Sequence, residues 1–328
     1  MRGDVMAAFQ HSTGTFIGKG GIEIFFQQWE VANPKAVLVI IHGLGEHSGR
    51  YGNLIDALQN KGIAIFGLDH RGFGRSGGKR GHVDSFMDYI YDMKIFVNMI
   101  RDKHPNKPVI MLGHSMGGVL ALKYALTHAE DLDALILSSP GLVPAIKVPA
   151  WKKNLAIFLS SRIPSLTMPS GLDATTISRD KEVVKQYLDD PLVHDKVTPR
   201  FYVEMMNTID ECINRCGEIK LPLLLFHGTA DALVLDEASK IVYQKASSKD
   251  KTLKLFEGLY HETMNELEPD RKKVLKVVAD WIVAHAKKTT TTKPKAASKP
   301  VKKAAPKKAK PKKVIKSKPK TSKKAKKK

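Results

Sequence analysis

Four short, uninterrupted apolar runs constrain the fold more strongly than any other feature of this chain. They cover residues 36–41, 63–68, 108–112 and 134–137. A continuous run rich in β-branched residues is typical of a strand that is buried on both faces. Because the segments between the runs have helical periodicity, the pattern predicts a mostly parallel sheet with helices packed against it.

Further elements extend this pattern towards both ends of the chain. An early strand is expected over residues 22–29, antiparallel and at the sheet edge, and later strands over 221–226 and 252–256. Helices are expected over residues 51–60, 86–103, 117–128 and 274–285. The elements therefore define an α/β protein with residues 1–141 and 220–286 as the two parts of one core.

Residues 142–219 interrupt the alternation of strands and helices. This stretch has several prolines and helix-like pieces but no clear buried strand. We interpret it as a cap inserted between two strands, lying over the carboxyl edge of the sheet, where ligands bind in open α/β sheets. The prediction is a helical cap domain that shapes a pocket.

The charge is concentrated at the carboxyl end. Of the 54 Lys and Arg residues, 20 are lysines at or after Lys287, where no Asp or Glu occurs, which leaves 34 basic and 33 acidic residues in the body. The segment 287–328 has almost no large apolar residue and cannot offset the entropy of ordering. We expect this Lys/Pro/Ala-rich tail to be disordered.

The spacing of the two cysteines and the composition of the amino end predict the cellular compartment. Cys212 and Cys216 are four residues apart, which suits two reduced thiols better than a disulfide. No signal peptide is recognisable at the amino end, and no apolar run is long enough to span a bilayer. We expect a cytoplasmic protein, with peripheral membrane contact as an open alternative.

The motif with the clearest chemistry is Gly113 to Gly117, which reads GHSMG. It follows a predicted buried strand and begins a predicted helix, the context of the nucleophile elbow in the α/β-hydrolase fold. Small residues on each side allow the sharp turn that exposes the serine hydroxyl. The motif therefore predicts this fold, with Ser115 as a nucleophile.

A serine nucleophile needs a base and an acid that orients the base, in the chain order Ser, acid, His. Asp231 follows the predicted strand 221–226, and His261 follows the strand that ends at residue 256. Both then lie at the carboxyl edge beside Ser115. The alternatives are that Asp231 caps a helix, that nearby Asp236 is the acid, and that His261 is a surface loop residue.

The oxyanion hole is expected to use two backbone amides. One belongs to Met116, directly after the nucleophile. The other belongs to Leu44, in the loop that follows the strand 36–41. The alternative is that this loop forms only a tight turn.

The combination of motifs resembles monoacylglycerol lipases. The similar segments, in the same order, read HGLGEHSGRY (42–51), DHRGFGRSGG (69–78), GHSMGG (113–118) and HGTAD (227–231), together with Tyr260 and His261. The resemblance spans about residues 15–285, whereas the lysine tail has no counterpart in the family pattern. It implies hydrolysis of monoacylglycerol to fatty acid and glycerol, with no cofactor and no metal.

The resemblance also implies polar groups that recognise the glycerol head group. The matching residues are Glu46, Arg50, His114 and Tyr187. The alternative for Glu46 and Arg50 is a structural ion pair that holds their loop. For Tyr187, the alternative is packing within the cap.

Two further segments suggest partners. Residues 148–159 place Trp151, Leu155 and Phe158 at helical spacing beside lysines, which suits either an interfacial membrane helix or a stripe packed on the core. The tail suits an anionic membrane or nucleic acid, bound without sequence preference, or a solvated tail. No specific protein partner is predicted.

Two other functions remain open on the sequence alone. The first is a different serine hydrolase of the same fold, such as a lysophospholipase, a general carboxylesterase or an aminopeptidase. The second is a polyanion-binding protein that acts through its basic tail.

Overall fold

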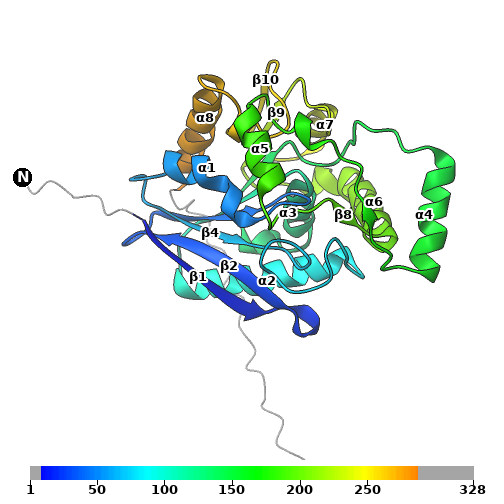
Figure 1. The fold of residues 1–328 in the computed structure, drawn as a ribbon. Helices are drawn as coiled ribbons and strands as arrows, with labels where there is room; N and C mark the ends of the chain where they lie inside the picture. Colours follow the sequence, from blue (N-terminus) through cyan, green and yellow to red (C-terminus); the bar gives the residue numbers. More distant parts are fainter. Residues whose placement is uncertain (1–8, 287–328) are drawn as a thin grey trace, which may run out of the picture. The chain divides into compact units, whose positions relative to one another are not determined.

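The structure, a computed structural model, describes residues 9–286 and is built around an eight-stranded sheet (Figure 1). The strand order is β1-β2-β4-β3-β5-β6-β9-β10. From β4 to β10 all neighbours are parallel, and β1 and β2 are antiparallel to their neighbours. The strands are β1 (Gln10–Ile17), β2 (Glu23–Glu30), β3 (Ala36–Ile41), β4 (Ile63–Leu68), β5 (Val109–His114), β6 (Ala134–Ser138), β9 (Leu223–Gly228) and β10 (Lys251–Phe256). The predicted mostly parallel sheet is confirmed.

The buried apolar runs form the central strands, as predicted. Strands β3 and β4 have the predicted bounds, and every residue in them is buried. The antiparallel strand expected over 22–29 is present as β2, but its expected position at the sheet edge is wrong, because β1 pairs outside β2 and occupies the edge. Most residues of β1 are exposed, so this strand has no apolar run that would reveal it.

Helices cover both faces of the sheet because each central strand presents alternate residues to opposite sides. Val37 and Val39 of β3 belong to the apolar cluster that includes α2 (Phe86–Lys103), α3 (Met116–Thr127) and α7 (Glu237–Lys245), whereas Leu38 and Ile40 belong to the cluster that includes α1 (Gly52–Ala57) and α8 (Asp270–His285). Figure 1 shows α1 and α8 on one side of the sheet and α2 on the other. Short 3₁₀ helices occur at Lys19–Gly21, Ser48–Tyr51, Ala129–Asp131, Ala174–Thr176, Cys216–Glu218 and Thr263–Asn265.

The segment between β6 and β9 is mostly helical. It contains α4 (Ala150–Arg162), α5 (Lys181–Asp189) and α6 (Pro199–Arg215), together with the two-residue antiparallel strands β7 (Met168–Pro169) and β8 (Lys196–Val197). Helix α6 packs on α3 and buries Phe201, Ile209 and Cys212, while α4 packs on α6. The segment therefore has an inner helix, α6, that packs on the core and an outer helix, α4, that packs on α6. The bounds of the cap at residues 142 and 219 stay a proposal.

Three further predictions concern the carboxyl-terminal tail, membrane spans and the cysteines. The predicted disordered tail, 287–328, lies outside the described residues. Within residues 9–286, no helix has the length and apolar character that a bilayer span requires. Cys212 and Cys216 are buried free thiols.

Candidate active site

The turn between β5 and α3 holds Ser115 in a strained conformation. Its backbone has φ 54° and ψ −120°, outside the regions that L-residues usually adopt. Glycine is required on both sides: an added Cβ would lie 2.2 Å from the Gly117 carbonyl oxygen at Gly113, and 2.0 Å from the Ile41 carbonyl oxygen at Gly117. The Ser115 N–H donates to the Ser138 carbonyl at 3.0 Å, which ties the turn to the neighbouring strand. The surrounding backbone therefore fixes the serine at the carboxyl edge of the sheet.

The structure brings Asp231 and His261 together at the same edge. Asp231 follows β9, His261 follows β10, and Asp231 Oδ2 lies 2.6 Å from His261 Nδ1. The other carboxylate oxygen, Oδ1, accepts hydrogen bonds from the backbone N–H groups of Leu233 and Val234, at 2.8 and 2.9 Å. The rival acid Asp236 is instead the residue before α7, and it pairs with a lysine on that helix.

Charge pairing determines the protonation of these two groups. Burial raises the pKa of Asp231. The charge of His261 and hydrogen bonds from two histidines lower the pKa by more than burial raises it, so the net pKa is far below its usual range. Burial lowers the pKa of His261, and the charge of Asp231 more than compensates, so the net pKa is raised. Asp231 is thus ionised at physiological pH, and its charge favours the protonated form of His261.

A cavity of about 460 Å³ connects this pair to Ser115. Its lining includes Leu44, Ser115, Tyr187 and His261. Among the described residues no hydrogen bond joins Ser115 Oγ to His261. Such contacts are often long before substrate binds and tighten in the reacting complex. The hydroxyl of Ser115 and the ring of His261 thus face one cavity, and Asp231 contacts His261 from behind the cavity wall.

The two expected amides flank Ser115. Met116 is the first residue of α3, so its N–H has no acceptor within the helix and lies at the positive end of the helix dipole. Leu44 lines the cavity, and an added Cβ on the preceding residue, Gly43, would lie 3.2 Å from Ser115 Cβ. Both peptide groups are therefore close enough to Ser115 to face an oxyanion.

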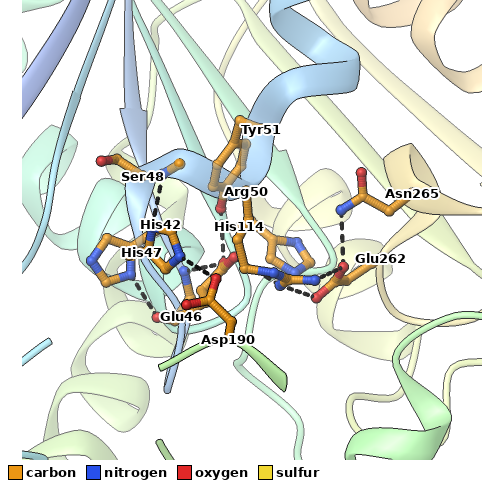
Figure 2. A network of polar contacts seen from close by, with 12 residues as sticks. His42, Glu46, His47, Ser48, Arg50, Tyr51, His114, Asp190, Glu262 and Asn265 are labelled. Carbon is orange, nitrogen blue, oxygen red and sulfur yellow. Dashed lines mark hydrogen bonds and ion pairs between the residues drawn. The ribbon is translucent and has the colours of Figure 1, made fainter. Parts of the chain in front are cut away.

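Glu46 and Arg50 form a buried ion pair rather than leaving their polar atoms free (Figure 2). Arg50 donates to Glu46 Oε2 at 3.1 Å and to both oxygens of Glu262, at 2.6 and 2.9 Å. Tyr51 donates its hydroxyl to Glu46 Oε1 at 2.9 Å. Burial raises the pKa of Glu46, but the charge of Arg50 lowers it to about 2. These contacts match the structural ion-pair alternative.

His114 and Tyr187 contact the cavity directly. The His114 ring lies 4.8 Å from that of His261, and its Nδ1 is 3.1 Å from Ser138 Oγ. Burial and the charge of His261 lower the pKa of His114 to about 4, so its ring is neutral at physiological pH. The Tyr187 ring lies 4.6 Å from the Arg50 guanidinium carbon, so this tyrosine of α5 both lines the cavity and packs on the loop that contains Arg50.

Comparison with known proteins identifies the family. The sequence profile described as serine aminopeptidase, S33, matches residues 32–268. The chain belongs to this family. A monoacylglycerol lipase from Mycolicibacterium smegmatis is 35% identical over 282 residues, which are 85% of this chain and 100% of that protein. Phospholipase YtpA from Bacillus subtilis is 35% identical over 256 residues, 76% and 95% of the two chains. The crystal structure of Paleococcus ferrophilus monoacylglycerol lipase, 30% identical, covers 85% of this chain and 100% of that one with a TM-score of 0.72. The predicted resemblance to monoacylglycerol lipases and the α/β-hydrolase fold are thereby confirmed.

This member of the serine aminopeptidase S33 family has site residues that sequence reasoning missed. His227 Nε2 lies 3.0 Å from Asp231 Oδ2, and its Nδ1 lies 2.9 Å from Ser239 Oγ. Asp231 therefore accepts from two histidines. The four-residue spacing of His227 and Asp231 was visible in the sequence, but it becomes a contact only because the chain turns after β9. Glu262 follows His261 directly and gave no signal, since its partner Arg50 is 212 residues away.

Among the described residues, one group of side chains has the geometry for a metal ion. His128, Glu130 and Asp131 bring ligand atoms within 4.8 Å of one another. Asp131 already accepts hydrogen bonds from Lys94 and Tyr124. The group lies beyond the end of α3, outside the lining of the cavity that holds Ser115.

Proposed function

We propose that this chain hydrolyses monoacylglycerol to a free fatty acid and glycerol through an acyl-enzyme on Ser115. The observation that carries the proposal is that Ser115 and His261 line one cavity, while Asp231 Oδ2 lies 2.6 Å from His261 Nδ1. The substrate class is supported by the relative from Mycolicibacterium smegmatis, which is named a monoacylglycerol lipase and is matched over 100% of its own length. The reaction class is carboxylic ester hydrolysis.

Acylation follows from the protonation states of the site. His261, held by Asp231, accepts the proton of Ser115 as the serine oxygen attacks the ester carbonyl. The N–H groups of Leu44 and Met116 donate to the oxyanion. His261 then donates the proton to the departing glycerol oxygen, and Asp231 stabilises the imidazolium during both transfers.

Deacylation repeats the same steps with water. His261 accepts a proton from water, the hydroxide oxygen attacks the acyl carbonyl, and His261 returns the proton to Ser115 Oγ as the fatty acid leaves. We assign the head-group side of the cavity to His114 and Tyr187. Glu46 and Arg50 support this side by holding the loop around Leu44.

A substrate panel tests the proposal. Purified chain and Ser115→Ala are assayed on monoacylglycerol, diacylglycerol, triacylglycerol, lysophosphatidylcholine with the same acyl chain, p-nitrophenyl butyrate and an aminopeptidase substrate. We expect Ser115-dependent turnover with the highest kcat/KM on monoacylglycerol. Preference for lysophosphatidylcholine would overturn the substrate class and favour the lysophospholipase alternative, which the relative named as a phospholipase supports.

We also propose that the enzyme is cytoplasmic and contacts membranes peripherally through α4. Three apolar side chains on this helix are more than half exposed: Trp151 at 63%, Ile157 at 58% and Phe158 at 56%. Lysines 152 and 153 on the same helix suit an anionic lipid surface. A helix of this kind delivers a sparingly soluble lipid to the cavity.

The lysines from residue 287 onward belong to the same proposal as a second attachment to anionic surfaces. Each lysine near such a surface contributes about 1 kcal/mol, and nucleic acid is the competing polyanion. Salt titration of binding to anionic vesicles and to DNA, with and without residues 287–328, separates the two. Binding to neither would overturn it.

A further inference from the structure

His42 makes two hydrogen bonds that fix which of its ring nitrogens carries the proton. It lies directly after β3, and its side chain is fully buried. The His70 backbone N–H donates to His42 Nε2 at 2.8 Å, so Nε2 is an acceptor. In the neutral ring the hydrogen then sits on Nδ1, which lies 2.8 Å from the Gly43 carbonyl oxygen. His42 Nδ1–H therefore donates to Gly43.

The surroundings keep this ring neutral. Burial lowers the pKa of His42, and the charges of Asp69 and Glu46 offset only part of the effect. The rings of His70 and Phe73 pack beside it, with centroids 4.4 and 6.0 Å away. The donor on Nδ1 thus persists across the physiological pH range and has a fixed direction.

The carbonyl that His42 holds belongs to the peptide group of the expected oxyanion amide. The Gly43 C=O and the Leu44 N–H are parts of one planar, trans peptide, so they point in opposite directions. His42 holds the carbonyl on the side of the buried histidine cluster. The Leu44 N–H therefore points the other way, and Leu44 lines the cavity beside Ser115.

The same loop is held from its other side by Glu46. The Gly43 N–H donates to Glu46 Oε1 at 2.6 Å, and Tyr51 and Arg50 fix that carboxylate. Glu46 thus anchors the amide before the critical peptide, whereas His42 contacts the critical peptide itself. Among the described residues, His42 is the side chain that hydrogen-bonds to the carbonyl of that peptide.

We propose that His42 is a positioning residue for the oxyanion hole: its Nδ1–H holds the Gly43 carbonyl so that the Leu44 N–H points at the developing oxyanion. The inference rests on the proposed ester hydrolysis at Ser115. A hydrogen bond on the carbonyl also polarises the peptide and strengthens its N–H as a donor. His42 thereby acts on the transition state without touching substrate.

The neighbouring His70 offers a matched control. Its ring is equally buried, but neither of its ring nitrogens has a hydrogen-bond partner in the described structure. His42→Leu and His70→Leu therefore make the same change in the same cluster, and only the first removes hydrogen bonds. The His70 backbone N–H stays in place in both.

The test compares these two variants on p-nitrophenyl butyrate and monoacylglycerol, and in their affinity for an acyl trifluoromethyl ketone, which forms a tetrahedral oxyanion on the serine. For His42→Leu we expect kcat to fall about tenfold to a hundredfold relative to His70→Leu, because a misaligned donor loses part of the 10²–10³-fold effect of one oxyanion contact. KM should stay within about twofold, and ketone affinity should fall in parallel with kcat. Equal kcat in both variants, or a loss confined to KM, would overturn the inference.

A second pair of variants covers the case in which His42→Leu fails to fold. Asparagine places its amide nitrogen near the position of Nδ1, whereas glutamine places it near Nε2. We expect His42→Asn to retain more kcat and more ketone affinity than His42→Gln; the reverse order would contradict the proposal. The short ester and the ketone react at Ser115 without needing a glycerol head group. If these probes give the expected pattern but monoacylglycerol is not hydrolysed, the proposed substrate class is wrong and the proposed role of His42 stands.

Discussion

The carboxyl edge of the sheet and the outer helix of the cap are built in opposite ways. At the edge, Asp231 accepts four hydrogen bonds from buried groups, and Ser115 sits on a turn in which neighbouring glycines have no room for a side chain. On α4, a single residue of thirteen, Ser160, is buried, and apolar side chains face outward. The difference shows that the geometry of the reaction is fixed by the core, whereas the cap leaves its outer surface available for other contacts.

The largest effect is expected from removing the nucleophile. Ser115→Ala should lower kcat on any ester by about 10³-fold or more, because the serine, histidine and aspartate act as one unit. The melting temperature should stay within a few degrees. Steady-state kinetics and calorimetry measure both. Retained turnover in a pure preparation would show that the chemistry lies elsewhere.

The next largest effect separates the buried ion pairs of the core from the exposed pairs of the cap. Arg50→Met leaves the carboxylates of Glu46 and Glu262 buried without their cation, which should cost about 3–5 kcal/mol of unfolding free energy. The matched control is Lys185→Met, which removes a fully exposed pair with Asp189 on α5 and should leave the denaturation midpoint unchanged. Urea denaturation of the two variants measures the difference. Equal midpoints for Arg50→Met and Lys185→Met would contradict the expected difference between buried and exposed ion pairs.

The pH dependence tests how the core controls its base. Since the pKa of His261 is raised and the reaction needs its neutral form, kcat/KM should fall as pH decreases through a value above 6.5. His227→Leu removes one of the hydrogen-bond donors to the Asp231 carboxylate. The carboxylate then stabilises protonated His261 more strongly, and the pKa of His261 should rise. The acid limb should then move to higher pH, with kcat reduced by a few-fold. A limb that moves to lower pH would refute this account of the pair.

The smallest effect on chemistry is expected on α4. Trp151→Ser with Phe158→Ser should lower vesicle binding of the full chain about thirtyfold or more, since the two exposed rings together contribute about 2–4 kcal/mol when they enter lipid. Turnover of p-nitrophenyl butyrate should not change. Ile17→Ser, on β1 and 63% exposed, is the control that should keep vesicle binding. Vesicle binding that is unaffected by the α4 changes would remove the cap from membrane contact.

The same contrast explains how much could be predicted from sequence. The bounds of β3 and β4 followed from continuous apolar runs, and Ser115, Asp231 and His261 followed from strand-end motifs, because burial on both faces leaves a local signal. Strand β1 is largely exposed, and α7 has nine residues and buries few of them, so neither has a pattern that stands out.

Contacts between distant segments were beyond prediction for a different reason. The ion pair of Arg50 with Glu262 joins positions 212 residues apart, and the link from His42 to the oxyanion peptide depends on a ring tautomer. The motif HGLGE could be read as a loop that supplies an amide. Which side chain holds that amide depends on packing against His70, which only the folded chain determines.

The central claim, that monoacylglycerol is hydrolysed at Ser115, is tested most directly by active-site titration. Increasing amounts of a fluorophosphonate are added, the labelled residue is identified by peptide mass spectrometry, and residual monoacylglycerol hydrolysis is measured in the same samples. The account predicts one adduct per chain, on Ser115, with activity falling in proportion to labelling. Monoacylglycerol hydrolysis that persists after Ser115 is fully labelled would contradict it.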